Sequence, residues 1–151
     1  MGRLNERLAE HSLICLDTSI FIYHLEAHPA YLALTQELLA GVETGRWRAV
    51  TSTITIMELT VPAWQQGREA VARQYETLLV NFPNLDVVDV TRAVARRAAR
   101  LRARFRLRPA DALQVVAGLV SGATAIVTND HSLRLLQEII DVVILDDYQQ
   151  N

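Results

Sequence analysis

Five short runs of apolar, often β-branched residues alternate with longer segments of helical periodicity, and this alternation constrains the fold most strongly. The runs span 13–16, 47–53, 85–90, 124–128 and 142–145. Several lack the polar–apolar alternation of a half-exposed strand, which predicts strands buried on both faces. Strands that alternate with helices predict an α/β sandwich, in which helices flank a mostly parallel sheet.

The segments between these runs have the spacing of amphipathic helices. Helices are expected around 31–39, 56–61, 71–79 and 94–105, and the last has the clearest apolar stripe. The first is expected to end at Gly41 or Gly45, and the second near Pro62 or a little beyond. The segment 112–120 is apolar on nearly every side, which predicts a buried helix that Gly122 ends.

Length and composition suit one globular domain, expected over 1–151, because 50% of the residues are hydrophobic and 21% are charged. The chain has no lysine, which excludes lysine Schiff bases and P-loop phosphate binding. The single cysteine, Cys15, excludes an internal disulfide and a thiolate zinc site and indicates a reducing cytosol. The sequence has no secretory signal and no apolar stretch of the roughly 20 residues that a membrane helix needs. We therefore expect a soluble cytoplasmic protein that does not associate with a membrane.

Three carboxylates are predicted to meet at one edge of the sheet. Asp17 follows the first strand, Glu58 lies in the first turn of the helix after the second, and Asp130 follows the fourth. Ligands of open parallel sheets bind outside the carboxyl ends of the strands, so this edge is the candidate site. Asp111 begins the buried helix, just after Arg108 and a proline, and its place near the other acids does not follow from this rule.

Each acid also has a purely structural interpretation. Asp17 and Asp130 suit helix N-caps, Glu58 completes the capping-box pattern that starts at Thr55, and Asp111 complements a helix dipole. Taken together, however, carboxylates at one edge repel each other, and a buried carboxylate is costly unless it is paired or bound to a metal. A hard divalent cation such as Mg²⁺ or Mn²⁺ relieves that repulsion, which favours an acidic metal site.

Four segments that contain these acids form a known pattern. They are LDTSIFIYHLE from Leu16, STITIMEL from Ser52, LRPADALQVVAG from Leu107 and AIVTNDHSL from Ala125. In this order, across almost the whole chain, they resemble the motifs of PIN-domain ribonucleases, most of all the VapC-type toxins of toxin–antitoxin pairs. Two positions depart from the family pattern: Gln114 stands where a small or apolar residue is common, and Leu133 replaces the usual aromatic.

The resemblance implies a PIN-like three-layer sandwich and metal-dependent cleavage of RNA phosphodiester bonds. Asp17 and Asp111 would be the primary ligands of Mg²⁺ or Mn²⁺, and Glu58 and Asp130 would complete the site, directly or through water. It further implies a homodimer and a small antitoxin partner with an apolar or arginine-bearing tail. A housekeeping PIN ribonuclease in RNA processing and a catalytically silent binding module remain the alternatives.

Polar neighbours of the acids are candidates for orienting water, ligands or substrate, although local capping explains them equally well. They are Thr18, Thr128 and Asn129, and Arg108 is the best single candidate for a phosphate contact. Eight of the fifteen arginines fall within 92–108, where no acid interrupts them, in a chain of net charge −2. This local basic face suits an RNA backbone, a plain solvated helix face or an acidic protein partner.

His24 and His28 have the i, i+4 spacing of a metal pair, but no third nitrogen or sulfur ligand accompanies them. We therefore expect plain surface residues at both positions. His131 adjoins Asp130, within reach of a substrate. Trp47 and Trp64 suit the core or an interface better than base stacking.

Overall fold

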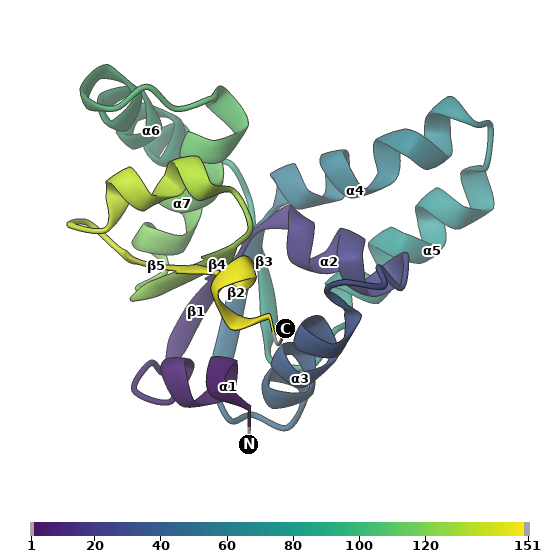
Figure 1. Cartoon of the computed structure of the whole chain (residues 1–151). Helices are drawn as coiled ribbons and strands as arrows, with labels where there is room; N and C mark the ends of the chain where they lie inside the picture. Colours follow the sequence, from purple (N-terminus) through teal and green to yellow (C-terminus); the bar gives the residue numbers. More distant parts are fainter. Residues whose placement is uncertain (1, 150–151) are drawn as a thin grey trace.

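The fold centres on five parallel strands in the order β3-β2-β1-β4-β5, in a computed structural model that describes residues 2–149 (Figure 1). The strands are β1 (Leu13–Leu16), β2 (Arg48–Ser52), β3 (Leu85–Val88), β4 (Ala125–Thr128) and β5 (Asp141–Ile144). Each lies within two residues of its predicted run. All four pairings are parallel, which confirms the predicted α/β class.

Helices cover both faces of the sheet and account for most of the remaining residues. They are α1 (Arg3–Leu8), α2 (Thr18–Leu25), α3 (Leu32–Glu43), α4 (Thr53–Gln65), α5 (Glu69–Val80), α6 (Arg92–Arg104) and α7 (Pro109–Val120), with 3-10 turns η1 (His131–Leu136) and η2 (Leu145–Tyr148). Helices α4 and α5 form an antiparallel arm that extends away from the sheet (Figure 1). Within residues 2–149, no helix is both long and apolar enough to span a bilayer.

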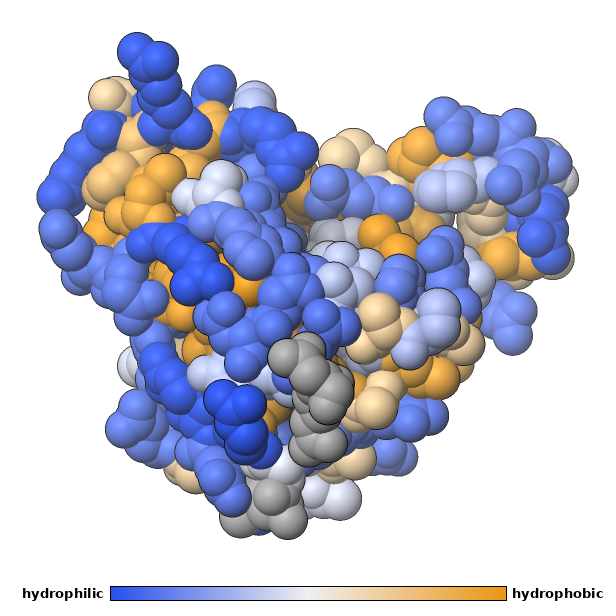
Figure 2. Space-filling model, viewed as in Figure 1, coloured by the Kyte–Doolittle hydropathy of each residue, from blue (hydrophilic) through white to orange (hydrophobic). Residues whose placement is uncertain are grey.

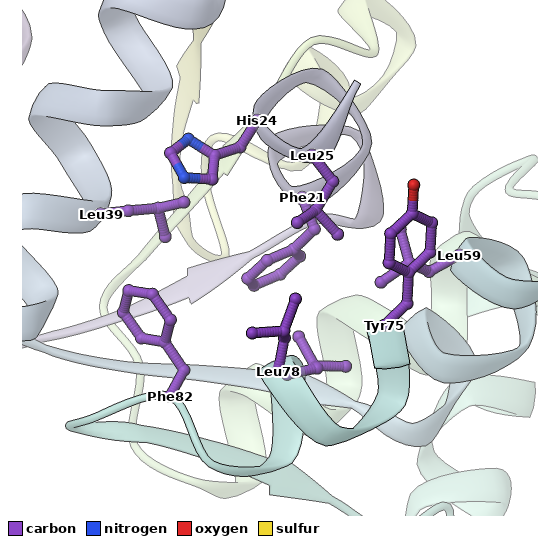
Figure 3. Close-up of a pocket in the computed structure, with 9 residues that line it drawn as sticks. Phe21, His24, Leu25, Leu39, Leu59, Tyr75, Leu78 and Phe82 are labelled. Carbon is purple, nitrogen blue, oxygen red and sulfur yellow. The ribbon is translucent and has the colours of Figure 1, made fainter. Parts of the chain in front are cut away.

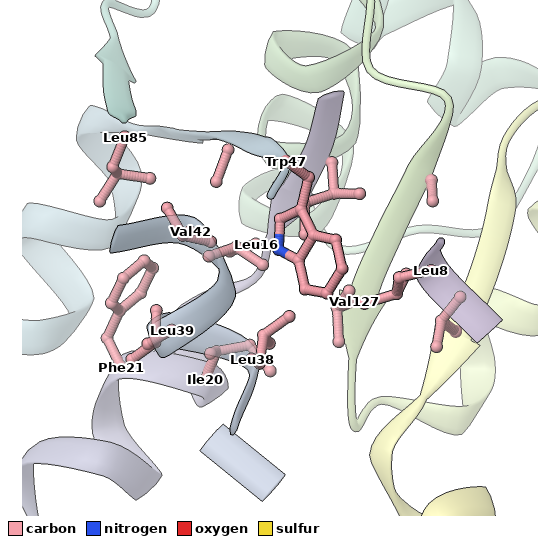
Figure 4. Close-up of a cluster of buried hydrophobic side chains, with 14 of the residues drawn as sticks. Leu8, Leu16, Ile20, Phe21, Leu38, Leu39, Val42, Trp47, Leu85 and Val127 are labelled. Carbon is pink, nitrogen blue, oxygen red and sulfur yellow. The ribbon is translucent and has the colours of Figure 1, made fainter. Parts of the chain in front are cut away.

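Successive strand residues point to opposite faces and so build two separate cores. From β1, Ile14 and Leu16 face the core under α1, α2 and α3, whereas Cys15 faces the core under α6 and α7. Trp47, only 2% exposed, fills the centre of the first core (Figure 4). Two apolar layers around one sheet explain why the strand runs lack polar alternation, and they make the predicted three-layer sandwich.

Helix α3 passes through Gly41 and ends before Gly45, which has φ of +79°. Of the two predicted stops, only the second is correct. Gly41 serves packing instead, because a Cβ built there would lie 2.6 Å from the Trp47 ring. Gly122 has φ of +92° beyond α7, and its predicted place at a helix end is confirmed.

Two features differ from expectation. Helix α1 was not predicted, because six residues with apolar positions only at Leu4 and Leu8 carry too little periodicity. Helix α4 begins earlier than predicted, whereas its end at Gln65 agrees with the predicted stop a little beyond Pro62. Its N-cap is Ser52, whose hydroxyl accepts a hydrogen bond from the Ile54 amide at 3.2 Å.

Candidate functional site

The four predicted acids line one pocket of about 360 Å³ at the carboxyl edge of the sheet. It lies where α2, α4, α7 and the turn after β4 meet, and its wall comprises Asp17, Thr18, Ser19, Ile22, Tyr23, Glu58, Arg108, Asp111, Asn129 and Asp130. The strand-end rule placed three of these acids there, and the packing of α7 across the sheet adds Asp111.

Glu58 is not in the first turn of its helix, because α4 starts at Thr53. The capping-box interpretation of Thr55 and Glu58 is therefore wrong. Instead, the Thr18 hydroxyl donates to Glu58 Oε1 at 2.8 Å and lies 3.1 Å from the Thr55 hydroxyl. A threonine from α2 thus positions a carboxylate from α4.

Asp17 is both an N-cap and a pocket residue. Its Oδ1 accepts a hydrogen bond from the Thr18 amide at 2.8 Å, and its Oδ2 accepts one from the Thr128 hydroxyl at 2.6 Å. Burial raises the pKa of Asp17, and the charges of Asp111 and Glu58 add to that increase, although the two hydrogen bonds oppose it. The surroundings of Asp17 therefore disfavour its ionised form.

Asp130 and Asp111 share one cation, the guanidinium of Arg108. Its Nε donates to Asp111 Oδ2 at 2.9 Å, and its Nη2 donates to Asp130 Oδ2 at 3.0 Å. Asp130 also caps η1, accepting from the Ser132 amide at 3.0 Å and hydroxyl at 2.6 Å. The Arg108 side chain is 75% exposed whereas the Asp111 side chain is 14% exposed, so a surface cation covers a largely buried acid.

A family model for the PIN domain matches residues 14–139, which include every acid of this pocket. This chain belongs to the PIN-domain family. The match confirms the family named by the sequence motifs. A comparison with curated proteins gives no match.

Solved structures with the same fold include toxins and members of toxin–antitoxin systems. One is a toxin–antitoxin complex from Klebsiella pneumoniae, with TM-score 0.63 and 19% identity over 87% of this chain and 97% of that chain. Another is VapC20 of Mycobacterium tuberculosis, described as a sarcin–ricin loop cleaving toxin, with TM-score 0.61 and 17% identity over 75% and 86% of the two chains. A third is VapBC-5 from the same organism, with TM-score 0.56 and 22% identity over 88% and 97%. At these identities the likeness establishes the fold.

Beneath the acids of this PIN domain lies a buried polar network centred on Gln114, which is 2% exposed. Its Nε2 lies 3.1 Å from the Leu16 carbonyl, 2.9 Å from the Thr51 hydroxyl and 2.8 Å from the Thr55 hydroxyl. Its Oε1 accepts from the Ser52 hydroxyl. The departure from the family pattern at this position therefore has a function: Gln114 ties α7 to β1, β2 and α4 directly below the pocket.

The donor chemistry of the pocket fits a hard cation. Its acids supply only oxygen ligands, and their mutual repulsion raises the pKa of Asp17 beyond the effect of burial. Ser19 also lines the pocket, and its buried hydroxyl has no hydrogen-bond partner among the described residues. An oxygen buried without a partner beside four carboxylates fits a site completed by a metal ion or by water.

A second charged cluster lies at the opposite edge of the sheet. Within residues 2–149, Glu10, His11 and Asp141 alone bring three metal-type ligand atoms within 4.8 Å of one another. His11 Nε2 lies 2.9 Å from Asp141, and the Arg7 guanidinium donates to the same carboxylate at 2.5 Å. Because Arg7 already neutralises this acid, the cluster fits an internal ion pair that anchors α1 to β5.

The predicted basic face is present on α6, where Arg92, Arg96, Arg97 and Arg100 are exposed. Among the described residues none of the four forms an ion pair, whereas Arg104 lies 3.8 Å from Glu138.

The histidine expectation was wrong, because His24 and His28 are both half-buried. Helix α2 ends at Leu25, so His28 lies outside it. The His28 ring packs against two aromatic rings, with its centroid 5.1 Å from that of Tyr23 and 4.8 Å from that of Tyr31. His24 borders an apolar cavity of about 120 Å³ between α2, α3, α4 and α5 (Figure 3). Burial lowers the pKa of His24.

Figure 2 shows the surface hollowed between the α6–α7 side of the molecule and the α4–α5 arm.

Proposed function

We propose that this chain is a metal-dependent endoribonuclease and the VapC-type toxin of a type II toxin–antitoxin pair. The observation that carries the proposal is the convergence of Asp17, Glu58, Asp111 and Asp130 on one pocket at the carboxyl edge of a PIN sheet. The toxin–antitoxin origin of the structural neighbours supports the toxin role. We further propose that 1–151 is a single PIN domain and that it acts in the cytoplasm.

Asp17 and Asp111 are the proposed primary ligands of Mg²⁺ or Mn²⁺, and Glu58 and Asp130 complete the site, directly or through water. A cation held there lowers the pKa of a bound water and neutralises charge that develops on the phosphate. Thr128 holds the Asp17 carboxylate in place through its hydrogen bond of 2.6 Å, and Thr18 holds Glu58.

Arg108 is the proposed phosphate contact. In the structure its guanidinium pairs with Asp111 and Asp130 and remains largely exposed. An arginine is a bidentate partner for phosphate as well as for carboxylate, so RNA can take the place of the two acids. The exposed arginines of α6, which precede Arg108 in the chain, supply further backbone contacts to RNA.

The proposed protein partner is a small antitoxin. Three hollows adjoin one another along α2 and α4: the apolar cavity beside Leu25 and Leu59, a mixed groove that shares these two residues, and the acidic pocket, which shares Ile22 and Glu58 with that groove. An antitoxin tail with apolar residues and an arginine matches these hollows, because the apolar residues suit the apolar cavity and the arginine suits the acidic pocket. It would restrain the enzyme by covering the acids.

We also propose a homodimer. Helix α4 presents an exposed apolar stripe at i, i+4 and i+7, formed by Met57, Val61 and Trp64, which are 51%, 39% and 52% exposed. A stripe of this kind is typical of an interface. Sedimentation of the purified chain, with Trp64→Ser as the matched variant, tests the assembly.

The test of the proposed reaction is cleavage of total RNA by the purified chain with Mg²⁺ or Mn²⁺, with EDTA as the metal-free control. We expect metal-dependent cuts that disappear in Asp17→Asn and persist in Asp86→Asn, whose carboxylate is 64% exposed on β3. Well-folded chain that cuts no RNA pool would instead favour a silent binding module. Arrest of growth on expression of the active chain, but not of Asp17→Asn, separates a toxin from a housekeeping ribonuclease.

A further inference from the structure

Three aromatic rings form a cluster beside the acidic pocket. Tyr23 and Tyr31 stack with centroids 4.3 Å apart and planes 21° apart, and His28 packs against both. The rings come from α2, from the loop after it and from the residue before α3. The loop turns through Ala27, whose φ of +50° is unusual for a residue with a side chain.

Polar groups hold the edges of these rings. The Tyr31 hydroxyl donates to Asp146 Oδ1 at 2.7 Å, and His131 Nε2 lies 2.6 Å from Asp146 Oδ2. Asn129 Nδ2 donates weakly to the Tyr23 hydroxyl, at 3.4 Å, while its Oδ1 accepts from the Asp146 amide at 3.0 Å. The rings are therefore fixed in orientation before any ligand arrives.

The aromatic cluster and the acids share one wall. Tyr23 and Asn129 line the same pocket as Asp17 and Asp130. The cluster is also accessible to solvent: Tyr23 and Tyr31 are only half-buried, and the side chain of Asp146 is 33% exposed. Tyr23 and Tyr31 pack in part against the first core, and their hydroxyl edges meet polar groups beside the acidic pocket.

We propose that Tyr23 and Tyr31, bordered by Asp146 and His131, form a subsite for an unpaired nucleobase of RNA next to the phosphate in the acidic pocket. The proposal rests on the ribonuclease function above and adds to it a subsite for one base, built from named residues beside the acidic pocket. Every base presents a flat π-face to an aromatic ring, and bases that stack on protein must be unpaired and turned outward. Asp146, His131 and Asn129 supply acceptors and donors for the base edge.

The test compares two probes of equal charge in the presence of Ca²⁺, an oxygen-seeking cation, with the integrity of the RNA checked afterwards. One probe is single-stranded pentaadenylate, and the other is the same ribose-phosphate pentamer without bases. We expect the native chain to bind pentaadenylate ~10-fold more tightly, the order expected for one stacked base. Tyr23→Leu should remove that difference and leave binding of the abasic pentamer unchanged.

Two control variants isolate the ring. Tyr23→Phe keeps the aromatic face and should retain the preference for pentaadenylate. Tyr75→Leu removes a half-buried tyrosine that borders the apolar cavity but not the acidic pocket, and it should not alter the ratio of the two affinities. The native chain provides a measurement that needs no variant: adenosine monophosphate, but not ribose 5-phosphate, should shift the ring-proton resonances of Tyr23 and Tyr31.

Equal affinity of the native chain for the two probes would overturn the base subsite and leave the ribonuclease function intact. Binding of neither probe, together with no cleavage of RNA, would overturn both. Retention of the full pentaadenylate preference by folded Tyr23→Leu would also exclude Tyr23 as the stacking surface.

Discussion

Arg108 and Asp111 form an ion pair across the first turn of α7, with 2.9 Å between Nε and Oδ2. The same guanidinium reaches Asp130 at 3.0 Å. Burial alone would raise the pKa of Asp130, but hydrogen bonds from Ser132 and the charge of Arg108 lower it overall. In the metal-free chain, therefore, Arg108 supplies part of the positive charge that a divalent cation would bring to this pocket.

This relationship predicts that Arg108→Gln strengthens metal binding. A cation that binds Asp111 and Asp130 must displace the guanidinium, and an exposed ion pair is worth roughly 0.2–1 kcal/mol. We expect the Kd for Mn²⁺, measured by calorimetry, to fall by about two- to five-fold. Arg104→Gln, which removes an exposed arginine beside Glu138, should leave the Kd unchanged. Weaker Mn²⁺ binding by Arg108→Gln would mean that Arg108 supports the acids rather than competing for them.

The Gln114 network predicts a large loss of stability in Gln114→Leu. The substitution leaves the buried Ser52 hydroxyl without its acceptor. It also removes the amide that bonds the Leu16 carbonyl and the Thr51 and Thr55 hydroxyls, which keep their bonds to one another, in a region closed to water. Unsatisfied buried groups cost about 1–3 kcal/mol each, and we expect a fall of ~3 kcal/mol in the free energy of unfolding by urea. Gln74→Leu, on the exposed face of α5, should change it by less than about 0.5 kcal/mol. A loss no larger than that of Gln74→Leu would show that the network adds no stability.

The strands could be predicted from the sequence because a strand buried on both faces needs apolar residues at successive positions. Their parallel arrangement then placed Asp17 and Asp130 at one edge. Asp111 could not be placed in the same way, because it belongs to a helix, and its position depends on how α7 crosses the sheet. That crossing depends on contacts distant in sequence, such as Gln114 with Leu16.

The aromatic cluster could not have been predicted from spacing. Tyr23, Tyr31 and Asp146 belong to three separate segments, and only the tertiary fold brings them together. Helix α1 was missed for a different reason, because a helix of six residues shows too few turns for its periodicity to stand out. Local patterns thus identified elements and their ends, while the contacts between distant segments required the structure.

Gly41→Ala is expected to destabilise the chain even though alanine favours helices. The new methyl group would lie 2.6 Å from Cζ2 of Trp47, which is almost completely buried. Overpacking a core costs about 1–3 kcal/mol, and better helix propensity returns roughly 1 kcal/mol. We expect a net loss of ~1 kcal/mol in the free energy of unfolding.

The control for that clash is Trp47→Phe, in which a smaller ring replaces the indole. The double variant Gly41→Ala, Trp47→Phe should be more stable than the sum of the two single effects predicts. Strict additivity of the two effects would show that the loss does not arise from contact between the methyl group and the ring.

The lowered pKa of Asp141 predicts that the folded chain loses stability in acid. Burial alone would raise its pKa, but hydrogen bonds from Arg7, Gln137 and His11 lower the pKa below the ordinary value of 3.8. A carboxylate with a lowered folded-state pKa stabilises the fold above the unfolded-state pKa, and this stabilisation disappears as the pH falls through the folded-state pKa. Asp141→Asn should therefore be less stable than the native chain at pH 7, by ~1–3 kcal/mol.

The difference between the two chains should begin to shrink as the pH falls below about 4, where the carboxyl of the unfolded chain takes up its proton, and should disappear as the pH falls through the lower folded-state pKa. Unfolding by urea at a series of pH values measures it. Asp86→Asn, a 64% exposed acid 3.4 Å from Arg48, should show no such dependence beyond about 0.5 kcal/mol. A difference between Asp141→Asn and the native chain that stays constant from pH 7 to acid would mean that the cluster stabilises α1 through packing rather than through the charge of Asp141.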